Sequence, residues 1–189
     1  MKDEKLFILV LLGTLREGRR SEVIARYVLS RLERIEGVKT ELIDPRDIGL
    51  QRDGYGPDVS SKYPEYGELI KKSDGLIIVS PEYNHGYPGT LKEVLDMQYG
   101  EYSHKACGIV GVSSGPFGGA RMIENLAHVV KALGMVMPKK DLNVMNVQDA
   151  FTKTGKPKIK QLQKFTDDFL LDVIWLAKAM RWGRNNLAN

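Results

Sequence analysis

The chain has 189 residues, 42% of them hydrophobic, which is enough for a single domain over 1–189 with a sizeable core. One cysteine excludes an internal disulfide and a cysteine-rich metal site, so we expect a reducing, cytoplasmic location. No apolar run approaches the ~20 residues of a membrane span, so we expect no membrane partner. The basic excess behind the net charge of +4 is C-terminal, and the lysines of "KTGKPKIKQLQKF" lie in a Gly/Pro-broken loop and on a helix face that we expect to be solvated, so we expect no nucleic-acid partner.

Short apolar runs alternate with amphipathic segments along the chain. The runs end at Gly, Ser, Pro or Asp and predict buried strands at 6–13, 39–44, 75–80, 106–113 and 135–138. Helical spacing of apolar residues predicts helices at 21–36, 64–73, 90–98, 121–133 and 159–182. Thr90 and Glu93 have the spacing of a capping box. The alternation indicates a three-layer α/β domain with a mostly parallel sheet and helices on both faces.

Ligands of such sheets bind outside the carboxyl ends of the strands, so the loops after the first, third and fourth strands are the candidate site. The first loop, "GTLREGRRS", leads into a helix whose N-terminal amides favour an anion. Thr14 and Ser21 add hydroxyls, and Arg16, Arg19 and Arg20 add positive charge. We expect a phosphate here; the alternative is that Ser21 only caps the helix and the arginines are solvated.

The first loop matches neither common nucleotide motif. It lacks the Gly-Lys-Ser/Thr element of a triphosphate loop and the third glycine of a dinucleotide fingerprint. Cys107 also lacks the arginine that a low-molecular-weight phosphatase carries six residues later.

The second loop, "SPEYNHGYPGTLKEVLD", offers groups suited to a planar aromatic ligand. Tyr83 or Tyr87 could meet its face, Asn84 and backbone amides could donate hydrogen bonds, and Gly86 and Gly89 permit close approach.

Together, "GTLREGRRS" and "PEYNHGYPGTLKEVLD" resemble the NADPH-dependent FMN reductase family, which includes flavin, quinone, azo and chromate reductases. The third loop, "SSGPFGGARMIENL", is also similar to that family, so the resemblance spans about Leu6 to Leu133. It implies a flavodoxin-like, five-stranded parallel sheet of order 2-1-3-4-5. It also implies FMN as cofactor, with NADPH or NADH as co-substrate.

The resemblance assigns the predicted contacts of FMN to particular residues. Its phosphate would be bound by Thr14, Arg16 and Ser21, with Arg19 or Arg20 in support. Its isoalloxazine ring would be lined by Pro81, Glu82, Tyr83 and Asn84, and its pyrimidine edge by Ser113, Gly115, Gly118 and Gly119. The flavin supplies the chemistry, so we expect no catalytic acid or base and no metal.

The resemblance therefore implies an NAD(P)H oxidoreductase that reduces a small acceptor: a quinone, free flavin, azo compound or metal oxyanion. Two alternatives stay open: a flavodoxin-like electron carrier, although such carriers are usually acidic and this chain has a pI of about 9.0, or a non-enzymatic module for a phosphorylated ligand. We expect a homodimer or homotetramer, with the apolar side chains of Thr90–Met97 forming the subunit interface.

Overall fold

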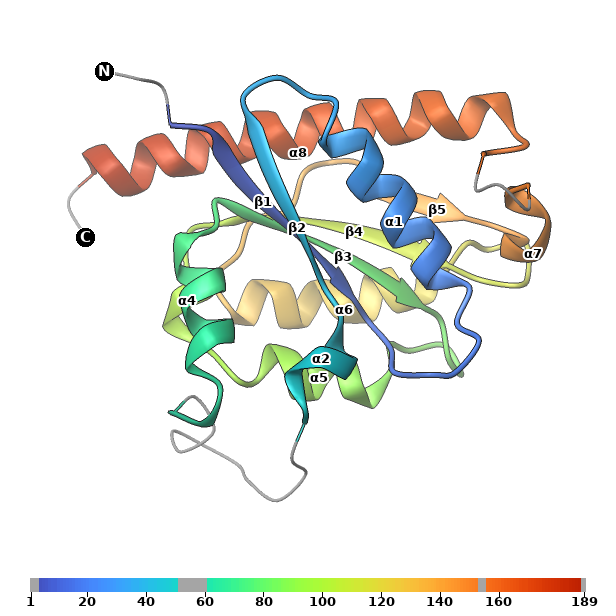
Figure 1. Cartoon of the computed structure of the whole chain (residues 1–189), viewed down its shortest axis with the longest axis horizontal. Helices are drawn as coiled ribbons and strands as arrows, with labels where there is room; N and C mark the ends of the chain where they lie inside the picture. Colours follow the sequence, from blue (N-terminus) through green and yellow to red (C-terminus); the bar gives the residue numbers. More distant parts are fainter. Residues whose placement is uncertain (1–3, 51–60, 153–155, 188–189) are drawn as a thin grey trace.

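The computed structural model describes residues 4–50, 61–152 and 156–187. Five parallel strands form one sheet in the order β2-β1-β3-β4-β5 (Figure 1). Their bounds are Leu6–Leu12 for β1, Val38–Ile43 for β2, Gly75–Pro81 for β3, Ala106–Val112 for β4 and Leu142–Val144 for β5. The order and the parallel direction confirm the flavodoxin-like architecture that the sequence predicts.

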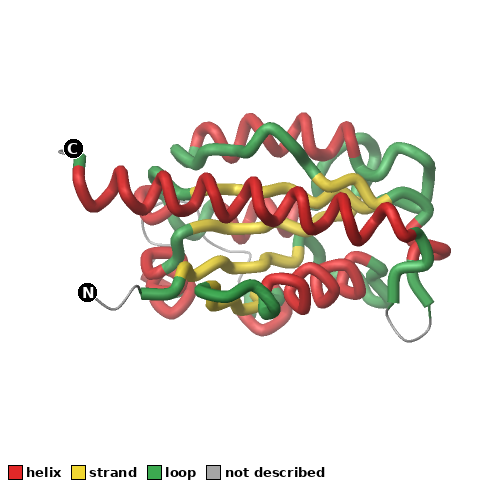
Figure 2. The backbone as a smooth tube through the Cα atoms, turned by 90° about the horizontal axis from the view of Figure 1, so that it is seen from above, coloured by secondary structure: helices red, strands yellow, loops and turns green. Residues whose placement is uncertain are grey.

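Helices cover both faces of the sheet, as the views in Figures 1 and 2 show. One face packs against α1 (Ser21–Leu32) and the long α8 (Lys160–Asn186). The other packs against α4 (Pro64–Lys72), α5 (Gly89–Leu95) and α6 (Ala120–Ala132). Three short elements connect these: α2 (Pro45–Ile48), a 3-10 turn η1 (Gly100–Tyr102) and α7 (Val147–Ala150).

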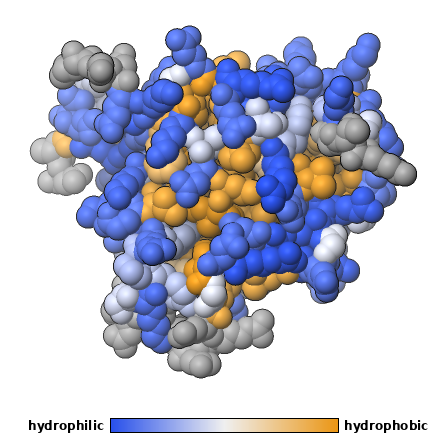
Figure 3. Space-filling model, in the orientation of Figure 1, coloured by the Kyte–Doolittle hydropathy of each residue, from blue (hydrophilic) through white to orange (hydrophobic). Residues whose placement is uncertain are grey.

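The two apolar layers follow from the alternation of side chains along each strand. In β1, Ile8 and Val10 point into the layer with α1 and α8, whereas Leu9 and Leu11 point into the other. Every residue of β1 is buried, but the edge strand β2 alternates between buried and exposed positions. On the face shown in Figure 3, hydrophobic residues form a central band framed by hydrophilic ones.

The fifth strand lies later in the chain than predicted. Segment 135–138 makes only an isolated bridge, in which the Val136 amide donates to Lys105 O at 2.9 Å and the Cys107 amide donates to Val136 O at 2.8 Å. Pro138 has no N–H to continue this ladder. The chain therefore leaves the sheet and returns as β5, which pairs with the other end of β4.

Several predicted helix boundaries also differ from the structure, and the C-terminal helix continues to Asn186 rather than ending at Trp182. The first helix ends at Leu32 rather than Glu36, and a turn follows in which Gly37 has a φ of 77°. The helix predicted at 90–98 is α5, which lies between β3 and β4 in the chain, begins at Gly89 after an extended Pro88 and ends at Leu95. Thr90 therefore lies inside the helix and makes no cap, so the predicted capping box does not form.

The apolar side chains of Thr90–Met97, predicted to form a subunit interface, are not on the surface of the molecule. Leu91, Val94, Leu95 and Met97 are buried in the core of the monomer beneath the sheet. Such side chains cannot also contact a second subunit, since their apolar surface is already removed from solvent.

A buried carboxylate anchors the C-terminal helix at the start of the sheet. Asp74 accepts hydrogen bonds from the Phe7 amide at 2.9 Å, from Arg181 Nε at 2.8 Å and from Arg184 Nη2 at 2.7 Å. Arg181 also donates to the carbonyls of Glu4 and Lys5. These bonds tie the last turns of α8 to the beginnings of β1 and β3.

None of the helices in the described ranges has the length and apolarity needed to cross a membrane.

Candidate functional site

A cavity of about 500 Å³ opens at the carboxyl ends of β1, β3 and β4. This is where a doubly wound parallel sheet binds ligands, because the crossover connections diverge on either side of that edge. The three loops of the predicted site all contribute to its wall, and the residues that line it are Arg16, Glu17, Gly18, Arg19, Arg20, Ser21, Pro81, Glu82, Tyr83, Val112, Ser113, Ser114, Gly115, Phe117, Arg121 and Val147.

The turn between β1 and α1 forms one wall. It leaves the sheet at Gly13, where a Cβ would stand 2.6 Å from Ser80 Oγ, so only glycine permits this packing. Thr14 follows and is buried; its Oγ1 accepts the Arg16 amide at 3.2 Å and lies 3.3 Å from Tyr83 Oη. Thr14 does not line the cavity itself, but it joins the first loop to the second.

Ser21 does not cap α1, contrary to the alternative interpretation of the sequence. The N-cap is Arg20, which has helical φ and ψ and makes no side-chain cap, and Ser21 is the first helical residue. Ser21 is only 2% exposed, and its Oγ has no hydrogen-bond partner in the described part of the chain. A buried hydroxyl without a partner costs free energy, so this one is suited to a ligand atom.

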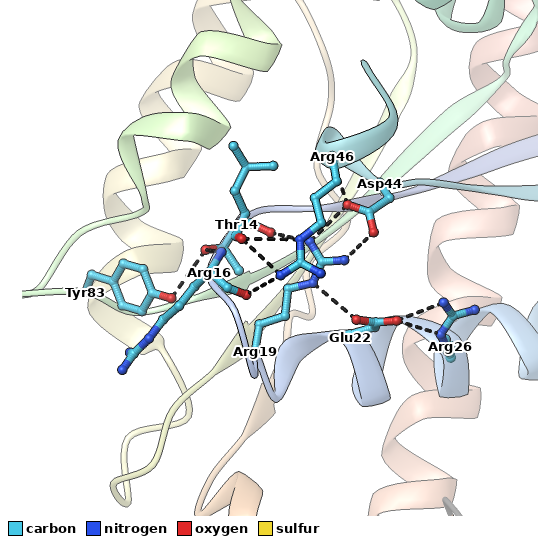
Figure 4. A network of polar contacts seen from close by, with 9 residues as sticks. Thr14, Arg16, Arg19, Glu22, Arg26, Asp44, Arg46 and Tyr83 are labelled. Atoms are coloured by element: carbon cyan, nitrogen blue, oxygen red, sulfur yellow. Dashed lines mark hydrogen bonds and ion pairs between the residues drawn. The ribbon is translucent and has the colours of Figure 1, made fainter. Parts of the chain in front are cut away.

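The three arginines of the turn differ in their surroundings (Figure 4). Arg19 is buried, pairs with Asp44 and Glu22, and donates from Nη1 to Thr14 O at 2.7 Å. Burial opposes its charge, but these carboxylates outweigh burial and raise the pKa of Arg19. Arg16 and Arg20 are exposed, and neither has a carboxylate partner among the described residues. The unneutralised charge therefore comes from Arg16 and Arg20.

The second loop is a tight two-residue turn. The Tyr83 amide donates to Gly86 O and the Gly86 amide to Tyr83 O, both at 2.9 Å, and the two central residues have φ values of 49° and 69°. Positive φ at both centres is the type I′ geometry, which asparagine tolerates well. Asn84 thus occupies the corner of the turn rather than the cavity wall, whereas Pro81, Glu82 and Tyr83 line the cavity.

Glu82 docks this loop onto the first turn of α6. Its Oε1 accepts from Arg121 Nε at 2.7 Å, and its Oε2 accepts from the Met122 amide at 3.3 Å. Burial opposes ionisation, but the bonds from Arg121 and Met122 prevail and keep the pKa of Glu82 below its usual value. Arg121 Nη1 also lies 2.9 Å from His85 Nε2. Glu82 therefore positions the loop and contributes little uncompensated charge to the cavity.

The third loop divides its predicted residues between two roles. Ser113 and Gly115 line the cavity, and Ser113 Oγ donates to Gly115 O at 2.8 Å. Gly118 and Gly119 have left-handed φ values of 57° and 78° and do not line it. A Cβ on Gly119 would lie 2.8 Å from the Val112 amide nitrogen, so these two glycines allow α6 to start close against β4.

The cavity suits a ligand with a phosphate and a planar ring. Arg16, Arg20 and the orphaned Ser21 Oγ line it, and the amides of residues 17–20 donate to no acceptor in the described chain. Tyr83 and Phe117, which is 62% exposed, add aromatic surface, and the guanidinium of Arg16 lies 5.8 Å from the centre of the Tyr83 ring. These groups fit FMN, whose dianionic phosphate needs donors and whose ring needs apolar contact. Direct contacts of single residues with FMN stay a prediction.

Several residues at the site escape the sequence prediction, among them Asp44, Arg46, Phe117 and Arg121. Asp44 is the N-cap of α2 and Arg46 lies in its first turn, and the segment "DPRD" carries the signal of an N-cap followed by proline. That signal predicts a short helix at the end of the second strand, beside the first loop. It does not reveal that Asp44 pairs with Arg19.

Comparison with known proteins agrees with this geometry. Residues 6–149 match the family described as NADPH-dependent FMN reductase. An NAD(P)H-dependent FMN reductase of Schizosaccharomyces pombe is 34% identical over 136 residues, which are 68% of this chain and 67% of that protein. A quinone reductase of Escherichia coli is 32% identical over 148 residues, covering 72% and 76%.

A solved structure shares the fold over nearly the whole chain. The flavoenzyme FerB of Paracoccus denitrificans, an NAD(P)H:(acceptor) oxidoreductase, superposes with a TM-score of 0.74 at 24% identity and covers 92% of this chain and 98% of its own. The chain therefore belongs to the NADPH-dependent FMN reductase family, as its loop motifs predict, and is an FMN-dependent oxidoreductase that uses NAD(P)H.

Proposed function

We propose that the protein reduces a small two-electron acceptor, with a quinone as the first candidate. The observation that carries this proposal is a single cavity that combines two arginines without a carboxylate partner among the described residues, Arg16 and Arg20, with aromatic surface from Tyr83 and the exposed Phe117. The arginines suit the phosphate of a retained cofactor. The aromatic surface suits a planar substrate, and the similarity to a quinone reductase supports this class.

Arg16 and Arg20 would donate charge-assisted hydrogen bonds to the phosphate, and Ser21 Oγ would donate a hydrogen bond for which the described residues supply no acceptor. Arg19 would support the turn that carries Arg16 and Arg20 rather than bind the phosphate itself, because its guanidinium is already bound to Asp44 and Glu22.

Pro81 and Tyr83 would line the isoalloxazine ring of FMN. The amides of Ser114 and Gly115, which donate to no acceptor within the described ranges, would serve its polar edge. When bound, FMN supplies the electron transfer between NAD(P)H and the acceptor. The chain itself needs to bind, orient and exclude water from the reacting face, and none of its side chains has to act as an acid or base there.

The test is an acceptor panel with the purified protein. We expect a yellow protein that oxidises NADPH or NADH with benzoquinone faster than with free FMN, an azo dye or chromate. A yellow protein that does not oxidise either nicotinamide would favour the electron carrier. A colourless protein that FMN cannot reconstitute would favour a binding module and overturn the proposal.

We also propose that the protein is a cytoplasmic homodimer or homotetramer. With the apolar side chains of Thr90–Met97 buried, the apolar surface left for an interface includes Trp175, which is 70% exposed, and Trp182 and Leu171 on the same helix. Light scattering at micromolar concentration tests this, and a monomer would contradict it.

A further inference from the structure

The carbonyls of the β1–α1 turn accept hydrogen bonds from two arginines, Arg19 of the turn itself and Arg46 of α2. Arg19 Nη1 donates to Thr14 O at 2.7 Å. Arg46, from α2, donates to Leu15 O from Nε at 3.3 Å and from Nη2 at 3.1 Å, and from Nη2 to Arg16 O at 2.9 Å. Consecutive carbonyls of the turn, from Thr14 to Arg16, are thus all bound by guanidinium groups (Figure 4).

The direction of these bonds matters because of the strand order. β1 lies between β2 and β3, so Asp44 and Arg46, which follow β2, lie on one side of the turn, and the loops after β3 and β4 lie on the other. The cavity is on that second side, where Pro81, Tyr83 and Ser113 line it. The carbonyls bound by Arg46 therefore point away from the cavity.

In a planar trans peptide, the N–H points opposite to the C=O of the preceding residue. Fixing the carbonyl of Arg16 toward Arg46 thus turns the Glu17 amide toward the cavity side. The Arg16 amide is taken by Thr14 Oγ1, but the amides of residues 17–20 have no acceptor in the described chain. Free backbone amides in such a turn can form an anion-binding concavity, and Arg46 fixes the direction of the first of them, the Glu17 amide.

Asp44 joins the two arginines into one support. Its carboxylate pairs with Arg19 and also accepts the Arg46 amide at 3.0 Å as the N-cap of α2. Burial opposes its ionisation, but Arg19 and the Arg46 amide outweigh burial and lower the pKa of Asp44. The pair Asp44–Arg19 is therefore charged over the physiological range and holds α2 beside the turn.

We propose that Arg46 is a positioning residue for the phosphate of FMN: it touches no ligand itself and holds the β1–α1 turn with its amides toward the phosphate. This inference rests on the proposed FMN site and adds a requirement to it. Flavin that lacks the phosphate should not depend on Arg46.

The test compares FMN with riboflavin as ligands of three variants of the full chain, with flavin fluorescence quenching as the readout. Arg46→Ala removes the bonds to both carbonyls, and Arg46→Lys keeps the charge but loses the planar fork that spans them. Arg26→Ala is the matched control: Arg26 is also exposed, belongs to the same network through Glu22, and does not contact the turn.

We expect Arg46→Ala to weaken FMN binding about tenfold and Arg46→Lys at least about threefold, with riboflavin binding changed less than about twofold in every variant. Arg26→Ala should change neither ligand. The inference is overturned if Arg46→Lys binds FMN like the parent protein, since charge alone would then suffice. Equal losses for FMN and riboflavin would also overturn it. If the parent protein fails to bind FMN, the proposed function is wrong. If the parent binds FMN and Arg46→Ala binds it with the same affinity, only this inference is wrong.

Discussion

Two arginine clusters lie at opposite ends of the sheet and differ in what satisfies their charge. At the start of the sheet, Arg181 and Arg184 both bind the carboxylate of Asp74, whose side chain is 5% exposed. At the carboxyl end, Arg16 and Arg20 face a cavity without a carboxylate partner among the described residues. The charge of the first cluster is neutralised by a carboxylate of the chain, whereas the charge of the second would be neutralised by an anionic ligand.

This difference separates arginines that stabilise the fold from arginines that serve a ligand. Arg19 shows that position alone does not decide, because it lies between Arg16 and Arg20 in sequence and is yet bound to Asp44 and Glu22. The informative property is the location of the partner carboxylate. The following changes test that criterion, beginning with the largest expected effect.

Asp74→Ala should destabilise the fold strongly and leave the flavin site intact. It removes the common acceptor of Arg181, Arg184 and the Phe7 amide, and breaking a buried ion pair costs about 3–5 kcal/mol. Urea unfolding should show this loss, while FMN affinity measured at 10 °C, where the variant is folded, should stay within twofold of the parent. A loss of FMN affinity without a loss of stability would contradict the proposed separation.

Arg16→Ala should have the opposite profile. One charge-assisted hydrogen bond to phosphate contributes roughly 1.5–3 kcal/mol, so FMN binding should weaken about ten- to a hundredfold. The stability of the apoprotein should stay within about 0.5 kcal/mol, since Arg16 is exposed and forms no ion pair with any residue that the structure describes. Melting temperatures with and without FMN distinguish the two effects. A lower apoprotein melting temperature with an unchanged FMN increment would show that Arg16 stabilises the turn instead.

Asp141→Asn tests whether a buried atom without a partner is enough to indicate a ligand. Asp141 Oδ1 has no partner in the described chain, as with Ser21 Oγ, but Asp141 does not line the cavity. Burial, with a smaller contribution from Glu124, raises the pKa of Asp141 to about 6. A carboxyl whose pKa rises on folding destabilises the protein where it is ionised, so the cost is absent below about pH 4 and complete above about pH 6.

The substitution should therefore raise the free energy of unfolding by about 1–2 kcal/mol at pH 7 and by almost nothing at pH 4. FMN affinity should not change. Denaturant titrations at both pH values check the prediction, and a gain of equal size at pH 4 would mean that the charge is not the cause.

Ser21→Ala should have the smallest overall effect of the four changes: a modest loss of FMN affinity and no loss of stability. A neutral hydrogen bond contributes about 0.5–1.5 kcal/mol, so FMN binding should weaken by about two- to tenfold. Because Ser21 Oγ makes no cap and has no partner, the apoprotein should keep its stability or gain slightly. Isothermal titration and thermal melting of the same sample check both parts. A stability loss of about 1 kcal/mol would restore the interpretation that Ser21 caps the helix.

The sequence by itself determined most strands and helices, because these depend mainly on residues that are close together along the chain. Apolar runs such as residues 6–12 predict buried strands because their burial requires no polar partner, and the helices follow from spacing within one or two turns. The loop motifs, read together, also indicated the family. The edge strand was missed because β5 contains only Leu142–Val144, too short for a periodic signal, and because Pro138 interrupts the earlier apolar run.

Only the tertiary structure decided which side chains remain available for a ligand. The sequence does not distinguish Arg16, Arg19 and Arg20 as ligand-binding residues. In the structure the Arg19 guanidinium is bound to Asp44, which lies 25 residues away in sequence, and is therefore not available to a ligand in the same way. Gly118 and Gly119 are part of the family-like loop, yet they pack against β4 and β5 rather than line the cavity. Charge neutralisation and close packing depend on which loops the strand order places side by side. That information is absent from any short stretch of sequence, because contacts across the sheet join segments that are far apart along the chain.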